Sequence, residues 1–389
     1  MAKQVEENLA RIEELTQRLL AAISNKRDVR ASLQGPNPEL YAKAASAYMT
    51  EMMVNPGKII EHQVSFWGQT VKHFVEAQHV LAQGKMEPPA DDTPADRRFG
   101  HEMWETNPYF NFIKQQYLMN AGAIQQAIAD VDTLDPDEKR RLEYFGQQIV
   151  DMFSPTNFLA TNPEALSLAA ETDGASLVAG LENLIHDLEA NDGELVVTLA
   201  DRQAFEVGEN LATTPGEVVF RNHLFELIQY SPVTETVHEI PLIIFPPWIN
   251  KFYILDLKPQ NSLIKWAVEQ GYTVYIVSWV NPDASYRDVA MTDYVEDGFL
   301  TAIEQVKTLC GVKKVNAVGY CIAGTTLSIT MALMAQRGDK SINAATLFTT
   351  LTDFSDRGDV GVFLDDDFVD GIEAEVKDAG ILSSFYMSR

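Results

Sequence analysis

Cys321 lies among small residues in the stretch V-G-Y-C-I-A-G at 318–324. The apolar residues before it predict a strand, and the residues after it predict a helix. A nucleophile at such a sharp turn presents its side chain to solvent, while the next backbone N–H points toward the oxyanion that forms on an acyl substrate. The positive end of the helix favours the reactive thiolate. The pattern indicates a cysteine nucleophile, but a small buried cysteine fits it as well.

The stretch departs from the pattern G-x-C-x-G at one position. Gly319 and Cys321 match, but Ala323 occupies the fifth position and Gly324 follows it. Alanine is the smallest side chain after glycine, so we expect the turn to form. The other cysteine, Cys310, closes a predicted helix and is interpreted as a packing residue.

A second candidate element is the loop P-P-W-I-N-K at 246–251, which follows a short apolar run. In α/β-hydrolases the other oxyanion donor is a backbone N–H in the loop after an early strand. Trp248 and Tyr253 are candidates for lining an acyl pocket. The alternative is an ordinary loop whose aromatic side chains serve packing.

The groups that would complete a thiol acyl-transfer site do not follow in the sequence. Such a site needs a base for the thiol proton and an acid that orients this base, and in this fold both come after the nucleophile, with the histidine last. All seven histidines precede Cys321. Asp353 follows it, but has no later histidine to orient, so we interpret Asp353 as a loop or capping residue. The acidic run 365–367 is interpreted as solvated surface and not as a metal site.

Apolar runs that alternate with helical stretches predict an α/β fold with a mainly parallel sheet in the second half of the chain. The predicted strands are 194–199, 218–220, 241–245, 272–278, 314–318 and 344–349, and the predicted helices are 261–270, 290–310 and 322–337. The first half is mostly helical, with apolar residues at three- and four-residue steps from Leu9 to Ile23 and a proline-rich break at 31–60. We therefore predict a helical domain at 1–200 and an α/β domain at 201–389.

The composition argues against several classes of function. A formal net charge of −26 disfavours nucleic-acid binding, which needs clustered Lys and Arg. No apolar run is long enough for a transmembrane segment, and the N-terminus lacks the apolar stretch of a secretory signal. Two cysteines do not make a disulfide framework, so we expect a cytoplasmic location.

Long motifs in both halves resemble the polyhydroxyalkanoate synthases, in particular the class that needs no second type of subunit. The motifs are D-R-R-F at 96–99, N-P-Y-F at 107–110, S-P-T-N-F at 154–158, F-E-V-G-E-N-L-A-T-T-P-G at 205–216, P-P-W-I-N-K-F-Y-I-L-D-L at 246–257, S-W-V-N-P-D at 278–283, V-N-A-V-G-Y-C at 315–321 and T-L-T-D-F-S-D at 350–356. This resemblance strengthens the interpretation of Cys321 as a nucleophile.

The resemblance implies an α/β-hydrolase catalytic domain that acts as an acyltransferase. Cys321 would accept a 3-hydroxyacyl group, such as 3-hydroxybutyryl, from coenzyme A. A hydroxyl would then take the acyl group, so that a polyester grows. The backbone N–H of Ile322 would be one oxyanion donor, and the loop around Ile249 and Asn250 would supply the second. Coenzyme A is the leaving group, and the resemblance implies no resident cofactor or metal.

The resemblance also implies partners and a location. In the family the helical half is linked with dimerisation and with attachment to polymer granules and granule-associated proteins, and the residues from about 355 onward resemble the start of a mobile cap. The catalytic Asp and His of the family would lie beyond Arg389, so we expect a C-terminally truncated catalytic domain that is inactive alone. Two alternatives stay open: a thioesterase or lipase-like hydrolase, and a non-catalytic granule-binding or subunit-pairing protein.

Overall fold

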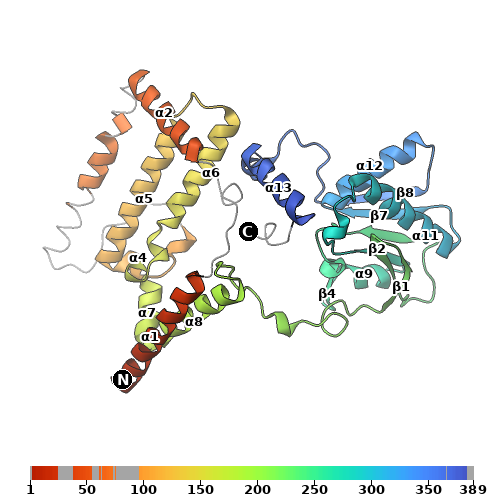
Figure 1. The fold of residues 1–389 in the computed structure, drawn as a ribbon, viewed down its shortest axis with the longest axis horizontal. Helices are drawn as coiled ribbons and strands as arrows, with labels where there is room; N and C mark the ends of the chain where they lie inside the picture. The colour runs from red at the N-terminus through yellow and green to blue at the C-terminus, as the bar shows by residue number, and fades with distance from the viewer. Residues whose placement is uncertain are drawn as a thin grey trace. The chain divides into compact units, whose positions relative to one another are not determined.

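The computed structural model describes residues 2–24, 38–54, 61–62, 64–72, 75, 96–364 and 366–382. It divides into two compact units, each visible in Figure 1. The helical unit comprises residues 1–198 and 358–371, and the sheet unit comprises residues 199–357 and 372–389. No helix within the described ranges combines the length and the apolar character needed to cross a membrane.

The helical unit is built from helices that begin at recognisable caps. Its helices are α1 (Ala2–Ser24), α2 (Pro38–Val54), α4 (Met103–Thr106), α5 (Pro108–Ala129), α6 (Pro136–Met152), α7 (Pro163–Glu171) and α8 (Ala175–Ala190). Asn107, Asp135 and Asn162 each accept a hydrogen bond from a backbone N–H of the first turn, and each precedes a proline. A side-chain acceptor followed by proline at the first helical position specifies a helix start locally.

One cluster of buried residues in the described part of the helical unit is aromatic. Phe99, Trp104 and Phe110 form a buried aromatic cluster, in which the rings of Phe99 and Trp104 lie 4.9 Å apart. Helix α1 packs against α8, with ion pairs from Arg11 to Glu182 and from Arg18 to Glu189. These pairs are partly exposed, so each adds little stability.

A late segment of the chain also belongs to the helical unit. The 3-10 turn η9 (Gly358–Phe363) packs on α6, where Arg141 Nε donates to Val362 O at 3.1 Å. The ring of Phe363 contacts those of Tyr144 and Phe145. Part of the segment that resembles the start of a cap is therefore grouped with the helices of the first half.

The sheet unit contains a six-stranded mixed sheet (Figure 1). Its strands are β1 (Gly216–Arg221), β2 (Phe225–Tyr230), β3 (Leu242–Phe245), β6 (Val274–Trp279), β7 (Val315–Tyr320) and β8 (Ile342–Phe348), in the spatial order β1-β2-β6-β3-β7-β8. Strand β2 pairs antiparallel with β1 and β6, whereas β6, β3, β7 and β8 pair in parallel. The α/β expectation is confirmed, and this order is consistent with an α/β-hydrolase-like fold.

Helices pack on the sheet, and the central strand β3 is buried, whereas the edge strands β1 and β8 are mostly exposed. The helical elements of this unit are α9 (Leu263–Glu269), α10 (Met291–Asp293), the π-helix η8 (Tyr294–Leu300), α11 (Thr301–Cys310) and α12 (Ile322–Gln336), while α13 (Asp366–Ala379) is divided between the two units. Ile243 and Phe245 join one core cluster, and Ile244 joins the other. This alternation with a period of two is what a strand imposes.

The structure corrects three expectations about secondary structure. Residues 194–199 form no strand, since among the described residues they pair with no neighbouring strand, and Leu199 is 93% exposed. Pro38 begins helix α2 and does not break one, because its missing N–H costs nothing at a helix start. Strand β2 is a strand that the apolar runs of the sequence do not predict.

Candidate active site

Cys321 lies at the turn between strand β7 and helix α12, and its backbone conformation is strained. Its φ is 55° and its ψ is −125°, a region that L-residues rarely adopt. The backbone N–H of Cys321 donates to Phe348 O of β8 at 2.8 Å, and the carbonyl accepts from Gly324 N at 2.8 Å. The residue is exposed. The turn therefore presents the thiol to solvent directly before the N-terminus of α12, and a buried structural cysteine is not what the structure shows.

Close packing around the turn explains its small residues. A Cβ on Gly319 would lie 2.6 Å from Gly324 Cα, and a Cβ on Gly324 would lie 1.9 Å from Thr350 Oγ1. Ala323, in contrast, is fully buried and is part of the core. The turn thus forms with alanine at the fifth position of the pattern, and the close approach that requires glycine occurs one residue later.

The loop after β3 emerges beside Cys321 at the same edge of the sheet. Strands β3 and β7 are parallel neighbours, and Phe245 pairs with Gly319. Parallel strands in register end at the same edge, so the chain after Phe245 and the chain after Tyr320 leave the sheet together. The predicted proximity of the loop to the turn is therefore present in the fold.

The backbone N–H groups of this loop are not equivalent. The N–H of Asn250 donates to Pro247 O at 3.0 Å and closes a turn, so it is not available to an oxyanion. Ile249 precedes it and its side chain is exposed. Of the two residues expected around the second donor, Ile249 and Asn250, Asn250 is therefore the weaker candidate, and Ile322 is the first residue of α12.

The aromatic residues of the loop make packing contacts. Trp248 is half-buried against the core, and its ring lies 5.1 Å from that of Tyr294 in η8. Tyr253 lies in the turn η6 (Phe252–Leu255) with its ring 5.4 Å from that of Phe252. Lys251 Nζ donates to Asn281 Oδ1 at 2.6 Å and so connects this loop to the loop after β6.

Asp256 anchors the far end of the same loop. It lies in β4 (Asp256–Lys258), which pairs with β5 (Asn261–Ser262), and is 1% exposed. Its carboxylate accepts from Thr214 Oγ1 at 2.7 Å and from Ser262 Oγ at 2.6 Å. Burial, and then the nearby Asp256 charge, raises the pKa of Tyr230.

The described histidines of the sheet unit do not lie beside Cys321. His238 precedes β3 and therefore lies toward the sheet edge opposite to Cys321. His223 precedes β2, which is three strands from β7 in the sheet order, or about 14 Å at the usual strand spacing. Neither residue is placed to take the thiol proton.

Asp353 is an exposed loop residue. Its Oδ1 accepts from the backbone N–H of Ser355 at 2.9 Å, and hydrogen bonds from Ser355 lower the pKa of Asp353. Among the described residues, no group of three or more His, Cys, Asp or Glu side chains is arranged to hold a metal ion.

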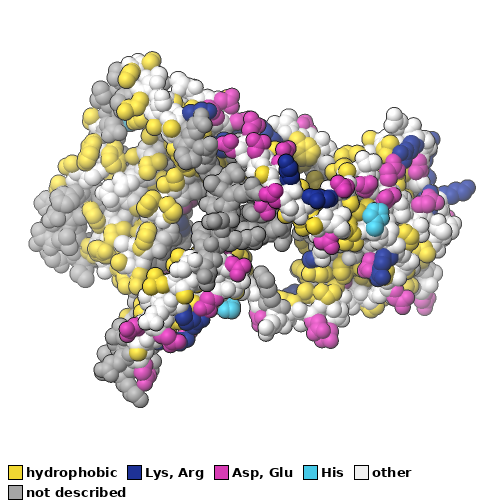
Figure 2. All heavy atoms as spheres, viewed as in Figure 1, with side chains coloured by type: hydrophobic (Ala, Val, Ile, Leu, Met, Phe, Trp, Pro, Cys, Tyr) yellow, Lys and Arg dark blue, Asp and Glu magenta, His cyan; other side chains and the backbone are white. Residues whose placement is uncertain are grey.

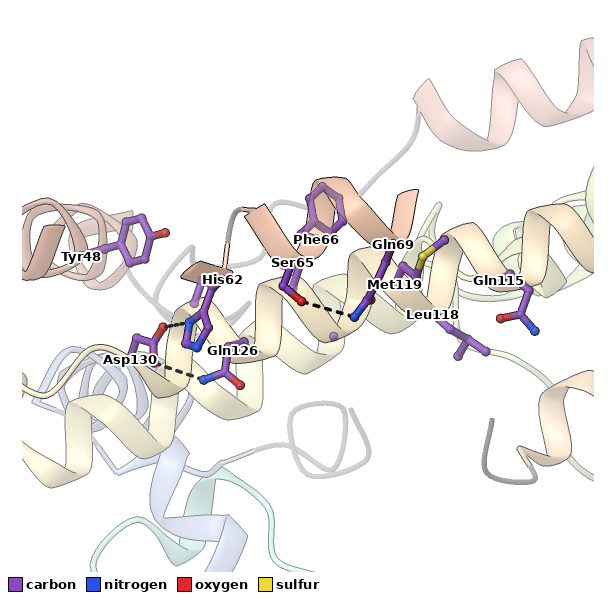
Figure 3. Close-up of a pocket in the computed structure, with 13 residues that line it drawn as sticks. Tyr48, His62, Ser65, Phe66, Gln69, Gln115, Leu118, Met119, Gln126 and Asp130 are labelled. Carbon is purple, nitrogen blue, oxygen red and sulfur yellow. Dashed lines mark hydrogen bonds and ion pairs between the residues drawn. The ribbon is translucent and has the colours of Figure 1, made fainter. Parts of the chain in front are cut away.

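The helical unit contains a pocket of about 370 Å³ between α2, α5 and the side chains of His62, Ser65, Phe66 and Gln69 (Figure 3). His62 Nδ1 lies 2.7 Å from Asp130 Oδ2, and Gln126 donates to the other carboxylate oxygen. Ser65 accepts from Gln69, and in Figure 3 it does not approach His62. The side chains of this pocket therefore do not form a Ser-His-Asp arrangement.

Three residues that pack around the turn or the loop after β3 carry no role in the sequence pattern: Trp279, Tyr294 and Thr350. Trp279 Nε1 donates to Pro246 O at 2.7 Å, and Thr350 packs on Gly324. Two of them lie in motifs that carry the family resemblance, S-W-V-N-P-D and T-L-T-D-F-S-D. No local pattern assigns them a role, because their partners lie far away in the chain.

The known proteins that match this chain in sequence are polyester polymerases. Residues 95–267 match the family model described as poly-beta-hydroxybutyrate polymerase (PhaC) N-terminus. The chain is 40% identical over 360 residues to a poly(3-hydroxyalkanoate) polymerase of Methylorubrum extorquens, covering 92% of this chain and 59% of that protein. It is 43% identical over 304 residues to the poly(3-hydroxyalkanoate) polymerase subunit PhaC of Cupriavidus necator, covering 78% of this chain and 50% of that protein.

The chain spans about half the length of the curated relatives that it matches. Two solved structures, a hydrolase from Agrobacterium vitis and an esterase from Rhizomucor miehei, share 16% identity with it at TM-scores of 0.29 and 0.31. They cover 44% and 47% of this chain and 64% and 61% of their own chains. At these scores the fold assignment depends on the sheet order alone. The sequence matches, in contrast, show that this chain belongs to the polyhydroxyalkanoate synthase family.

Proposed function

We propose that this chain carries the nucleophile of a polyhydroxyalkanoate synthase, which polymerises 3-hydroxyacyl groups from coenzyme A thioesters. The observation that supports this most directly is the strained, exposed Cys321 between β7 and α12. Strain of this kind persists only where the surrounding structure enforces it, and it is concentrated at functional sites. The sequence relatives supply the substrate class.

The reaction divides into two acyl transfers. In the first, Cys321 Sγ attacks the thioester carbonyl, the new S–C bond forms, and the bond to the sulfur of coenzyme A breaks. The thiol proton leaves with coenzyme A. In the second, a hydroxyl oxygen of another hydroxyacyl unit or of the chain end attacks the acyl-Cys321 thioester, and the ester forms as the hydroxyl proton returns to Sγ. Each step builds negative charge on one carbonyl oxygen, which the N–H groups of Ile322 and Ile249 would stabilise.

The proton acceptor is not assigned to a residue of this chain, since the two described histidines of the sheet unit lie away from Cys321. We therefore propose that the 389-residue chain alone turns over slowly or not at all. Its first half-reaction is still measurable near pH 9.5, where free thiols are mostly ionised without help from a base.

The test is acylation of Cys321 itself. The chain is incubated with 3-hydroxybutyryl-CoA at about pH 9.5 and the adduct is located by mass spectrometry of peptides. We expect one 3-hydroxybutyryl group on Cys321, none in Cys321→Ala, and an unchanged yield in Cys310→Ala, the matched control at the other cysteine. An adduct on another residue, or none on Cys321, would overturn the proposal.

Product analysis separates polymerisation from the hydrolase alternative. If the acyl acceptor is a hydroxyl of a second unit, acyl-Cys321 gives dimers and longer oligomers. If the acceptor is water, the product is free 3-hydroxy acid. We propose the first outcome on the basis of the relatives, and free acid as the sole product would support the thioesterase alternative.

We further propose that the helical unit mediates dimerisation and contact with the granule surface in the cytoplasm, where granule-associated proteins bind as well. Figure 2 shows apolar side chains gathered over this unit, and several large ones are exposed. They include Ile149, Met152, Phe153, Phe158 and Leu159. Exposed apolar surface of this kind favours association with an apolar partner. Sedimentation with polyester particles tests the contact, and Phe153→Asp with Phe158→Asp should reduce it.

A further inference from the structure

The loop that supplies the second oxyanion donor leaves the sheet through two consecutive prolines. Pro246 and Pro247 follow β3 directly and are buried. Neither has a backbone N–H, so this part of the loop cannot be fixed by donating to a neighbouring strand. The carbonyl of Pro246 is a strong acceptor, and a buried acceptor needs a partner.

That partner is an indole. Trp279 Nε1 donates to Pro246 O at 2.7 Å, and the bond is buried. Trp279 is the last residue of β6, which pairs in parallel with β3, so its side chain reaches the start of the loop from the neighbouring strand. The loop backbone is thus held by a side chain from β6.

The indole ring itself is held tightly. Its neighbours include Phe225, at 6.0 Å between ring centroids, and Phe299, at 5.6 Å. On another side lies Gly298 of the π-helix η8, where an added Cβ would stand 3.1 Å from two atoms of the Trp279 ring. The backbone N–H of Val280 also donates to Leu224 O at 2.9 Å, which fixes the end of the strand. The ring cannot shift without moving its neighbours.

The same group of rings continues to the loop. Tyr294 contacts both Trp279, at 5.5 Å between ring centroids, and Trp248, at 5.1 Å. Trp248 directly precedes Ile249. A hydrogen bond to Pro246 and an aromatic contact at Trp248 therefore fix the chain immediately before the N–H of Ile249.

We infer that Trp279 is a positioning residue that orients the Ile249 N–H toward the oxyanion through its hydrogen bond to Pro246. The catalytic consequence of this inference, the effect on Cys321 acylation, rests on the proposed function. Its structural consequence, the order of the loop after β3, does not. Oxyanion donors act through fixed geometry, and misplacement by about 1 Å can cost about a hundredfold in rate.

Two variants act on this hydrogen bond in different ways. Trp279→Phe keeps an aromatic ring but removes the donor. Gly298→Ala keeps the donor but pushes on the ring. Their matched controls are Trp266→Phe on the exposed face of α9 and Gly180→Ala in α8, where an added Cβ meets nothing within 4 Å.

The catalytic readout is the rate of Cys321 acylation by 3-hydroxybutyryl-CoA near pH 9.5. We expect the maximal rate to fall about tenfold or more in Trp279→Phe and in Gly298→Ala. The half-saturating thioester concentration and the rate of Cys321 alkylation by iodoacetamide should stay unchanged, since neither depends on the oxyanion donors. A general loss of structure would change all three measurements. Acylation within twofold of the unmodified chain would overturn the inference.

The structural readout is amide hydrogen exchange of the peptide that spans residues 248–255. We expect faster exchange there in both variants, with unchanged exchange in α12 and in the two controls. If Trp279→Phe does not fold, Gly298→Ala alone carries the test. If the unmodified chain forms no adduct at Cys321, the proposed function fails, and unchanged exchange of the loop would overturn the positioning role separately.

Discussion

Among the described residues, the two units differ in the extent of their clusters of buried apolar side chains. In the sheet unit Ile243, Ile244 and Phe245 are at most 1% exposed and lie inside continuous clusters. In the helical unit the buried aromatic cluster is small, and Phe153 is 63% exposed. The packed core of the sheet unit can therefore enforce a strained turn at Cys321, whereas the exposed apolar side chains of the helical unit support the proposed contact with a partner. The variants below test this difference.

The largest expected effect is on the free energy of unfolding, compared between substitutions of two phenylalanines. Phe245→Ala should lower the free energy of unfolding by about 4 kcal/mol, because it leaves a cavity in a closed core. Phe153→Ala should change it by less than about 0.5 kcal/mol, because the side chain is already exposed. Urea denaturation followed by circular dichroism measures both. Similar losses in the two variants would contradict the difference in burial.

The same substitution at two glycines should change the free energy of unfolding in opposite directions. Gly324→Ala places a Cβ 1.9 Å from Thr350 Oγ1. We therefore expect the free energy of unfolding to fall by about 2 kcal/mol and Cys321 acylation to become slower. In Gly180→Ala, in α8, the added Cβ has no atom within 4 Å. The higher helix propensity of alanine should therefore raise the free energy of unfolding by about 0.5–1 kcal/mol. Thermal denaturation reports both values, and a neutral Gly324→Ala would show that the loop after β8 moves away easily.

Strain at the nucleophile can be measured by removing its side chain. Cys321→Gly should be more stable than Cys321→Ala by about 1 kcal/mol, because glycine adopts a φ of 55° without strain. Both variants should lose acylation completely. Equal stability of the two variants would mean that the turn stores no strain, and the main structural support for the nucleophile would be lost.

The smallest expected effect is a pH dependence in the helical unit. The side-chain hydrogen bond from Arg98 lowers the pKa of Asp96 below its ordinary 3.8. A lowered folded-state pKa means that the stabilisation is present above 3.8 and is lost as the pH falls through the folded value. Since both partners are partly exposed, the contribution is less than about 1 kcal/mol. Asp96→Asn should remove this part of the acid dependence, seen as a shallower fall of the melting temperature below pH 4. An unchanged slope of the melting temperature against pH would exclude this contribution of Asp96.

Local sequence was sufficient for much of the fold. Short apolar runs predict β3, β6 and β7, because strands that are buried on both faces are rich in apolar residues. The run at 344–349 also predicts β8, although this edge strand is mostly exposed in the structure. Strand β2 was missed since Glu226 and Gln229 interrupt its apolar pattern. The opposite error occurs at 194–199, where apolar residues predict a strand but pair with no strand in the part of the chain that the structure describes.

For the candidate site, the sequence by itself determined the turn: Gly319, Cys321 and the change from strand to helix are contiguous, and their chemistry depends on local backbone geometry. Only the tertiary structure decided what holds this turn and its loop. The contact of Gly324 with Thr350 and the hydrogen bond from Trp279 to Pro246 join residues 26 and 33 positions apart. Such contacts follow from strand order and register, which place the ends of β6, β3, β7 and β8 together. No spacing along the chain encodes that arrangement.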